Sequence, residues 1–325
     1  MARQRTAPAQ DVSVFSRRFE SIVANVEQAI SGKDDAIRLA LVCMVAEGHL
    51  LIEDVPGVGK TSLAKAFAAS IDGVYNRIQF TPDLLPSDVT GVMVYNRSTG
   101  GFEFRHGGIF ANVVLGDEIN RASPKTQSAL LEAMEERQVT IDATTYHLDS
   151  PFMVIATQNP IEHEGTYPLP ESQLDRFLMR IEMGYPDKAA EIEILDTHAA
   201  ANPVDSIEAV ASADDIAAMV TMAQRVHVAP SLKSYLVDLA DVTRRHPRLT
   251  LGVSPRGTLA LLRASRALSA SVGREFVLPD DVKALAGPVL EHRLLLTPEA
   301  QMGGTSQGDV LDEILASVTV PTARS

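Results

Sequence analysis

The chain has 325 residues, enough for one large domain or two smaller ones with hydrophobic cores. Its 29 basic and 42 acidic side chains give a formal charge of −13, which argues against a surface built to grip duplex nucleic acid. Cys43 is the only cysteine, so no intrachain disulfide can form and a reducing compartment is indicated.

No segment of the sequence has the pattern of a membrane span or a leader. The longest apolar run, residues 39–52, is interrupted by Glu47, Gly48 and His49, and it is shorter than the roughly 20 residues that cross a bilayer. The first ten residues, MARQRTAPAQ, lack the hydrophobic centre of a signal peptide. We therefore expect a soluble, cytoplasmic protein without membrane insertion.

The N-terminal half alternates short β-branched runs with helical patterns, which is typical of an α/β fold with a parallel sheet. Two further stretches, residues 91–110 and 138–151, have their own alternation and turn residues and predict inserted hairpins. The strands are expected over residues 49–53, 75–79, 112–117, 152–157 and 178–183.

Strand patterns fade after residue 184, and from Ala213 onward the chain has the periodicity of amphipathic helices. Pro255 and Pro279 stand where the first turn of a helix accepts proline. The expected parts are a flexible N-terminal segment over residues 1–18, an α/β core over 19–184, a smaller all-α domain over 185–302 and a C-terminal tail over 303–325.

The stretch LIEDVPGVGKTSLAKA, residues 51–66, joins a predicted strand to a predicted helix, as a phosphate-binding loop does. Its glycines let backbone N–H groups converge on phosphate oxygens, and the helix adds its dipole. Lys60 is placed for the β- and γ-phosphates of ATP and Thr61 for Mg²⁺. A plain glycine-rich turn is the alternative. The residues expected to bind ATP are Pro56, Gly57, Val58, Gly59, Lys60, Thr61 and Ser62.

Asp54 stands where the usual phosphate-loop pattern begins with glycine. A carboxylate at that point would repel a triphosphate if it faced the ligand. Since the phosphate contacts come from residues 57–61, the opening position only starts the turn out of the strand. We therefore predict that Asp54 points away from the phosphates and bonds to nearby backbone or to a neighbouring chain.

Two more predicted strands end in polar residues at the same sheet edge. Asp117 would hold Mg²⁺, directly or through water, and Glu118 would polarise the attacking water. The alternative for both is a solvated acidic turn after a core strand. Asn159 can orient the water from the next strand, unless it is only a turn residue before Pro160.

Arginines follow in two places. Arg176, in a largely apolar stretch that also holds Arg180, can stabilise transition-state charge on the nucleotide of a neighbouring subunit. The alternative is an intrachain salt bridge from Arg176 to Glu171 or Asp175. Arg256, in the first turn of a predicted helix, would touch nucleotide or pair with an acid.

With these motifs in this order, the chain resembles AAA+ ATPases and more specifically the MoxR family. The similarity covers residues 19–296 and is carried by LIEDVPGVGKTSLAKA, QFTPDLLPSDVTG, GDEINRASPKTQSALLEAMEERQVT, VIATQNPIEHEGTYPLPESQLDRFLMRI and SPRG. It implies a P-loop core with a five-stranded parallel sheet in the order 5-1-4-3-2, a helix-2 insert at residues 91–110, a hairpin before sensor 1 at 138–151 and a C-terminal helical lid.

The resemblance also implies a role for each site residue. Ser31 and Lys33 depart from the family pattern, because they stand where its Val-x-Gly-Gln box lines the adenine pocket. The implied roles are Walker A for Lys60 and Thr61, Walker B for Asp117 and Glu118, sensor 1 for Asn159, arginine finger for Arg176 and sensor 2 for Arg256.

By this resemblance the protein is a remodelling chaperone that hydrolyses ATP with Mg²⁺ and works as a homo-oligomeric ring, a hexamer. Its client would be a von Willebrand factor A domain protein or an enzyme that needs a metal cofactor inserted. Two other functions share the architecture: a DNA-directed AAA+ motor, which the charge of −13 disfavours, and the ATPase subunit of a metal-chelatase complex. A nucleotide-binding scaffold without hydrolysis is disfavoured by Glu118, Asn159 and Arg176.

Overall fold

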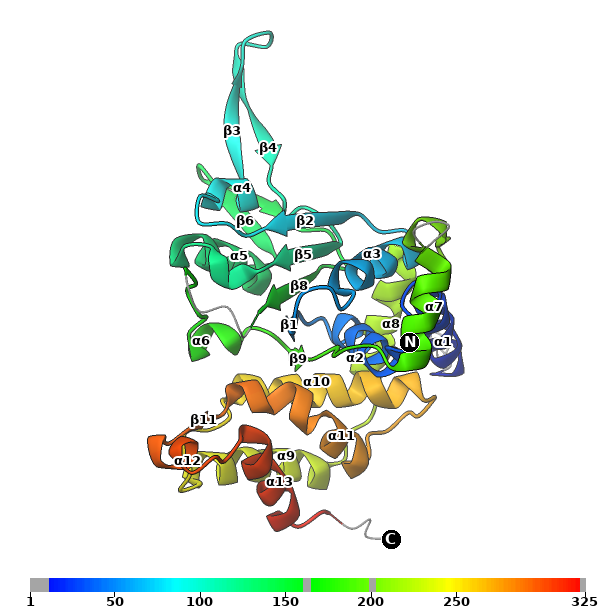
Figure 1. Cartoon of the computed structure of the whole chain (residues 1–325), viewed down its shortest axis with the longest axis vertical. Coiled ribbons are helices and arrows are strands. Elements are labelled where there is room, and N and C mark those ends of the chain that lie inside the picture. Colours follow the sequence, from blue (N-terminus) through cyan, green and yellow to red (C-terminus); the bar gives the residue numbers. More distant parts are fainter. Residues whose placement is uncertain (1–11, 160–164, 199–202, 322–325) are drawn as a thin grey trace, which may run out of the picture.

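A sheet-based core carries a long hairpin on one side and a helical layer on the other (Figure 1). The computed structural model describes residues 12–159, 165–198 and 203–321. The arrangement is the predicted α/β core followed by an all-α lid region. In these described ranges no helix is long and apolar enough to cross a membrane.

Five parallel strands form the central sheet in the order β2-β5-β8-β1-β9. Counted along the chain as the first to fifth core strands, this is the predicted order 5-1-4-3-2. Since all five strands run the same way, their carboxyl ends share one edge of the sheet and their amino ends share the other. The strands are β1 (Leu50–Glu53), β2 (Tyr75–Gln79), β5 (Val113–Asp117), β8 (Met153–Gln158) and β9 (Met179–Ile181).

Alternate residues along each strand pack into separate hydrophobic clusters on the two faces of the sheet. In β1, Leu50 and Ile52 pack with the cluster that includes the first three helices, whereas Leu51 packs with the cluster that includes α5. The core helices are α1 (Val12–Glu27), α2 (Asp34–Val45), α3 (Lys60–Ser70), α4 (Pro86–Thr90), η1 (Ile119–Arg121), α5 (Pro124–Glu136) and α6 (Glu171–Leu174).

Two antiparallel hairpins interrupt the core, as predicted for residues 91–110 and 138–151. The first, β3 (Gly91–Asn96) with β4 (Gly101–His106), projects far from the sheet (Figure 1). The second is β6 (Gln138–Ile141) with β7 (Thr144–His147). Phe104 of β4 stacks on Tyr146 of β7 with ring centroids 3.9 Å apart, so the two hairpins are in contact.

The region after residue 184 is built mainly from helices, and it closes onto the core. Leu261 and Ala264 of α10 are buried in the same hydrophobic cluster as Leu41 of α2. Its elements are α7 (Lys188–His198), η2 (Pro203–Ser206), α8 (Ala213–Arg225), α9 (Pro230–Arg245), β10 (Leu249–Leu251), α10 (Pro255–Ser271), α11 (Pro279–Leu290), η3 (Glu291–Arg293), β11 (Leu295–Leu296), α12 (Pro298–Met302) and α13 (Gln307–Ser317).

The N-terminal boundary differs from the prediction. A flexible segment over residues 1–18 is wrong from Val12 onward, because α1 begins there. Phe15 and Phe19 lie one helical turn apart and are buried with their rings stacked, which holds this turn against the core. The predicted tail over residues 303–325 contains α13, whose Val310 and Ile314 are buried.

Candidate active site

The predicted phosphate loop connects the end of β1 to the start of α3. Gly57 and Gly59 have φ angles of +85° and +96°, in the left-handed region that favours glycine. A Cβ built on Gly57 would meet nothing within 4 Å, so the backbone conformation, not lack of space, favours glycine there. Lys60 and Thr61 then open α3, so the helix N-terminus and the loop face the same space.

Asp54 turns its carboxylate into the protein, as predicted. One oxygen accepts the N–H of Val55 at 2.8 Å, and the other accepts the N–H groups of Met183 at 2.7 Å and Gly184 at 2.6 Å. The backbone oxygen of Asp54 accepts a hydrogen bond from the Lys60 ammonium at 2.8 Å. The buried carboxylate thus joins the phosphate loop to the segment that follows β9.

Lys33 binds the backbone oxygens of the same segment, whereas Asp54 binds its N–H groups. Its buried ammonium donates to the backbone oxygens of Met183, Gly184 and Tyr185 at 2.7, 2.9 and 2.8 Å. The departure from the adenine-box pattern therefore has a structural use in this chain, because Lys33 fixes the turn that Asp54 holds through N–H groups.

Asp117 is the last residue of β5 and Glu118 follows it, and Thr157 of the neighbouring strand β8 bonds to both. The Thr157 hydroxyl donates to Asp117 Oδ1 at 2.7 Å and accepts the Glu118 N–H at 2.9 Å. Glu118 has φ +56°, a left-handed conformation that costs energy for a residue with a side chain. The hydrogen bond from its N–H helps to hold this conformation.

Sequence reasoning missed two residues of β2, Arg77 and Gln79. Arg77 forms an ion pair with Asp117 at 2.5 Å, and the Gln79 amide donates to Glu118 Oε2 at 2.8 Å. Arg121 also donates to this oxygen, at 2.9 Å. The sequence did carry a signal for them: Arg77 and Gln79 are polar residues at alternate positions of β2, and β2 pairs with β5, which leads to the two carboxylates.

These residues surround a cavity of about 430 Å³ at the carboxyl edge of the sheet. Asn159, which follows β8, is buried at the cavity wall beside Thr157. The structure therefore brings together all the predicted site residues from the loop, β5 and β8 except Val58. The lining residues are Pro56, Gly57, Gly59, Lys60, Thr61, Ser62, Arg77, Asp117, Glu118, Thr157 and Asn159.

Val58 lies in an adjoining cavity of about 210 Å³, which shares Gly57, Gly59 and Ser62 with the first one. Ile30, Ser31 and Lys33 also line this second cavity. Its position next to the phosphate loop is where a base and sugar would extend from bound phosphates.

The chemistry of the larger cavity fits a Mg²⁺-bound triphosphate. Burial lowers the pKa of the Lys60 ammonium, and Asp54, Asp117 and Glu118 oppose this shift. The Lys60 ammonium, the start of α3 and the two carboxylates all line this cavity. The Thr61 hydroxyl and Asp117 carboxylate are hard oxygen ligands of the kind that Mg²⁺ prefers.

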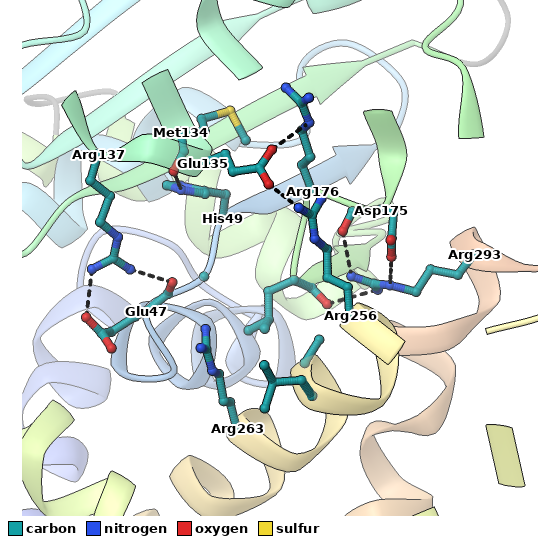
Figure 2. Close-up of a pocket in the computed structure, with 14 residues that line it drawn as sticks. Glu47, His49, Met134, Glu135, Arg137, Asp175, Arg176, Arg256, Arg263 and Arg293 are labelled. Atoms are coloured by element: carbon teal, nitrogen blue, oxygen red, sulfur yellow. Dashed lines mark hydrogen bonds and ion pairs between the residues drawn. The ribbon is translucent and has the colours of Figure 1, made fainter. Parts of the chain in front are cut away.

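Arg176 and Arg256 lie elsewhere, in a pocket of about 180 Å³ (Figure 2). Both form ion pairs with the carboxylate of Glu135, near the end of α5. Arg176 Nε lies 3.2 Å from Oε2, and Arg256 Nη2 pairs with Oε1. An intrachain ion pair of Arg176 was anticipated as an alternative, but the expected partners Glu171 and Asp175 were wrong. Asp175 binds the buried Arg293 at 2.7 Å instead.

This arginine pocket and the phosphate-loop cavity lie at opposite edges of the sheet. The pocket is lined by Gly48 and His49, which precede β1, and by Leu178, which precedes β9. The phosphate loop follows β1, whose four residues span about 13 Å. Among the described residues that line the larger cavity, neither Arg176 nor Arg256 occurs.

Comparisons with known proteins match both the core and the lid region of the chain. Residues 49–179 match the model of the ATPase family associated with various cellular activities (AAA), and residues 241–314 match the AAA lid domain. A solved structure of a candidate ATPase from Cytophaga hutchinsonii has a TM-score of 0.90 and 38% identity, covering 96% of this chain and 97% of that one.

Among curated proteins, YeaC of Bacillus subtilis is 50% identical over 303 residues, covering 93% of this chain and 95% of YeaC. Chaperone MoxR1 of Mycobacterium tuberculosis is 39% identical, covering 96% of this chain and 85% of its own length. Protein MoxR of Paracoccus denitrificans is 33% identical, with 96% and 99% covered. Together with the match to an AAA core and lid, these relatives show that the chain belongs to the MoxR family of AAA+ ATPases.

Proposed function

We propose that the protein hydrolyses ATP at interfaces between copies of itself in a closed ring and uses this cycle to remodel partner proteins. The observation that carries the proposal is the separation of the phosphate-loop cavity from the arginine pocket at opposite sheet edges. One chain then supplies half of two different active sites: the phosphate-loop cavity to one and the arginine pocket to another. Head-to-tail contacts that close into a ring join each half to its complement.

At the phosphate-loop cavity, the chain's own residues bind the substrate and direct the water. Lys60 and the amides that open α3 hold the β- and γ-phosphates. Glu118, fixed through Oε2 by Gln79 and Arg121, accepts a proton from the attacking water, and Asn159 orients that water. Mg²⁺ bound by Thr61 and Asp117 would neutralise phosphate charge.

Arg176 and Arg256 act on the nucleotide of the neighbouring copy. A guanidinium group stabilises negative charge that spreads over the γ-phosphate oxygens in the transition state. The Asp175 carboxylate accepts a hydrogen bond from the Ser254 hydroxyl at 2.8 Å, and Ser254 caps α10, whose first turn contains Arg256. This contact sets the core arginine and the lid arginine side by side, so both face the same neighbour.

The remodelling function is supported by the family and by the outer hairpin. Phe102, Tyr95, Val92 and Val94 of the β3–β4 hairpin are 68%, 53%, 45% and 44% exposed, and the hairpin projects from the core (Figure 1). A relative is named Chaperone MoxR1. We propose a hexameric ring in the cytoplasm, with a von Willebrand factor A domain protein or a metal-cofactor enzyme as client.

The test combines a basal ATPase assay with a trap. Wild-type protein should release phosphate from ATP and Lys60→Ala should not; equal turnover in the two would contradict the proposal. A Glu118→Gln ring stalled with ATP should retain a client protein in a pull-down that Lys60→Ala does not retain. Stimulation by DNA that falls steeply with salt, or by a chelatase partner with a porphyrin, would favour the rival functions instead.

A further inference from the structure

We propose that Glu135 is a positioning residue that holds Arg176 and Arg256 together toward the neighbouring copy's nucleotide. Figure 2 shows its carboxylate between the two guanidinium groups, with one oxygen paired to each. This assignment rests on the proposed function of the two arginines.

The two arginines belong to different parts of the molecule. Arg176 follows α6 in the core, and Arg256 is in the first turn of the lid helix α10. Glu135 comes from a third element, the last turn of α5. A single carboxylate therefore ties the core arginine to the lid arginine, and a rotation of the lid that moved Arg256 away from Glu135 would separate the pair.

The charges in the pocket single out Glu135. Glu47 pairs with Arg137 at 2.7 Å, and Asp175 pairs with Arg293 at 2.7 Å, so these two carboxylates each have one arginine. Only Glu135 among the described acidic residues of the pocket is shared by two. The lining contains five guanidinium groups and three carboxylates: Arg137, Arg176, Arg256, Arg263 and Arg293 against Glu47, Glu135 and Asp175.

This sharing has a direct electrostatic consequence. Two adjacent guanidinium groups repel each other, and a carboxylate between them reduces the repulsion. The sharing leaves the Arg176–Glu135–Arg256 group with one net positive charge, which suits an incoming phosphate. A planar guanidinium has five N–H donors, so a contact to Glu135 does not prevent it from donating to phosphate as well.

Residues at the amino edge of the sheet anchor the end of α5 that carries Glu135. The preceding residue, Met134, accepts a hydrogen bond at 3.0 Å from buried His49, whose other ring nitrogen accepts the Val154 N–H at 3.0 Å. Arg137 ends α5 in a left-handed conformation and anchors it to Glu47. The backbone on either side of Glu135 is therefore anchored to the core, and the side chain of Glu135, 34% exposed, extends from this fixed point.

The opposite end of α5 lies beside the chain's own catalytic carboxylates. Glu118 leads directly into η1, and Gln127 of α5 donates to the backbone oxygen of Ile119 at 3.1 Å. The helix has 13 residues and is about 20 Å long. It thus connects the residue that acts on this chain's ATP with the arginines that serve the neighbour's.

Steady-state ATPase kinetics test the assignment. Glu135→Ala should lower kcat by about 10- to 100-fold, as misplaced catalytic groups do, while KM for ATP and binding of a non-hydrolysable ATP analogue stay near wild type. Glu135→Gln, which keeps an oxygen acceptor, should lose less. Glu136→Gln, an exposed neighbour on α5, is the matched control and should keep wild-type kcat.

A mutant cycle separates positioning from folding. Because Glu135 acts through the arginines, Glu135→Ala should add less than about twofold to the loss in an Arg176→Ala/Arg256→Ala background. The same loss in both backgrounds, or wild-type kcat in Glu135→Ala while Arg176→Ala is impaired, would overturn the assignment alone. Absence of ATP hydrolysis by the wild type would instead overturn the proposed function on which it rests.

Discussion

The two edges of the central sheet carry opposite chemistry. At the carboxyl edge, Asp117, Glu118 and Lys60 line one cavity, whose chemistry suits a metal-bound phosphate. At the amino edge, guanidinium groups outnumber carboxylates in a pocket without a phosphate loop. We propose that each edge is half of an active site, so activity is expected to depend on how copies of the chain meet.

The largest expected effect is at the amino edge. Arg176→Ala should lower kcat by about 10³-fold, as loss of an arginine finger does, with ATP binding preserved because Arg176 does not line the chain's own phosphate-loop cavity. Phosphate release and analogue binding measure the two quantities. Arg245→Ala, at a 78% exposed side chain, is the control. Loss of binding in Arg176→Ala would mean that the arginine serves its own site.

A smaller loss is expected at the carboxyl edge. Glu118→Gln removes the proton acceptor but keeps the hydrogen-bonding shape, so kcat should fall by about 10²- to 10³-fold while ATP binding remains. Calorimetric binding and single-turnover hydrolysis check this split. Glu132→Gln, at an exposed position of α5, should leave both unchanged. Undiminished hydrolysis in Glu118→Gln would remove this residue from the mechanism.

The link between the phosphate loop and the segment that follows β9 should contribute measurably to the free energy of unfolding. Asp54→Ala leaves three backbone N–H groups without their acceptor, which should lower the free energy of unfolding by about 2–3 kcal/mol. Urea denaturation measures the difference, with exposed Asp312→Ala as the control. A change below about 0.5 kcal/mol would show that these hydrogen bonds are replaced by water.

His49 gives the smallest expected effect, and it depends on pH. Burial lowers its pKa from 6.5 to about 4, so the folded protein holds the ring neutral while the unfolded chain binds a proton below pH 6.5. The contribution of the neutral ring to the free energy of unfolding is complete well above pH 6.5 and declines as the pH falls toward 4, by about 1.5 kcal/mol between pH 6.5 and 5. Denaturation at several pH values should show a shallower decline in His49→Gln; equal slopes would contradict the prediction.

The sequence predicted the carboxyl edge well because its signals are local. Lys60 and Thr61 stand in one motif, and Asp117 and Asn159 each end a strand pattern, so parallel strands alone bring them to one edge. The polar residues Arg77 and Gln79 carried the same kind of signal but belonged to no motif that sequence reasoning had recognised.

The amino edge could be predicted only in part, because its contacts join distant segments. Glu135 and Arg256 are 121 positions apart, and nothing in either local sequence indicates that they meet. Arg176 was expected to pair with Glu171 or Asp175 because those residues are near in sequence. In the folded chain Asp175 pairs with Arg293, and Glu135 pairs with both Arg176 and Arg256.

In the proposed ring, each active site combines the carboxyl edge of one copy with the amino edge of the next. Mixing Lys60→Ala with Arg176→Ala protein tests it most directly, since each variant alone lacks one half. A mixed ring contains interfaces where intact Arg176 from the first variant meets the intact phosphate loop of the second. The mixture should recover ATPase activity that neither variant has alone, and a mixture as inactive as its components would contradict the shared site.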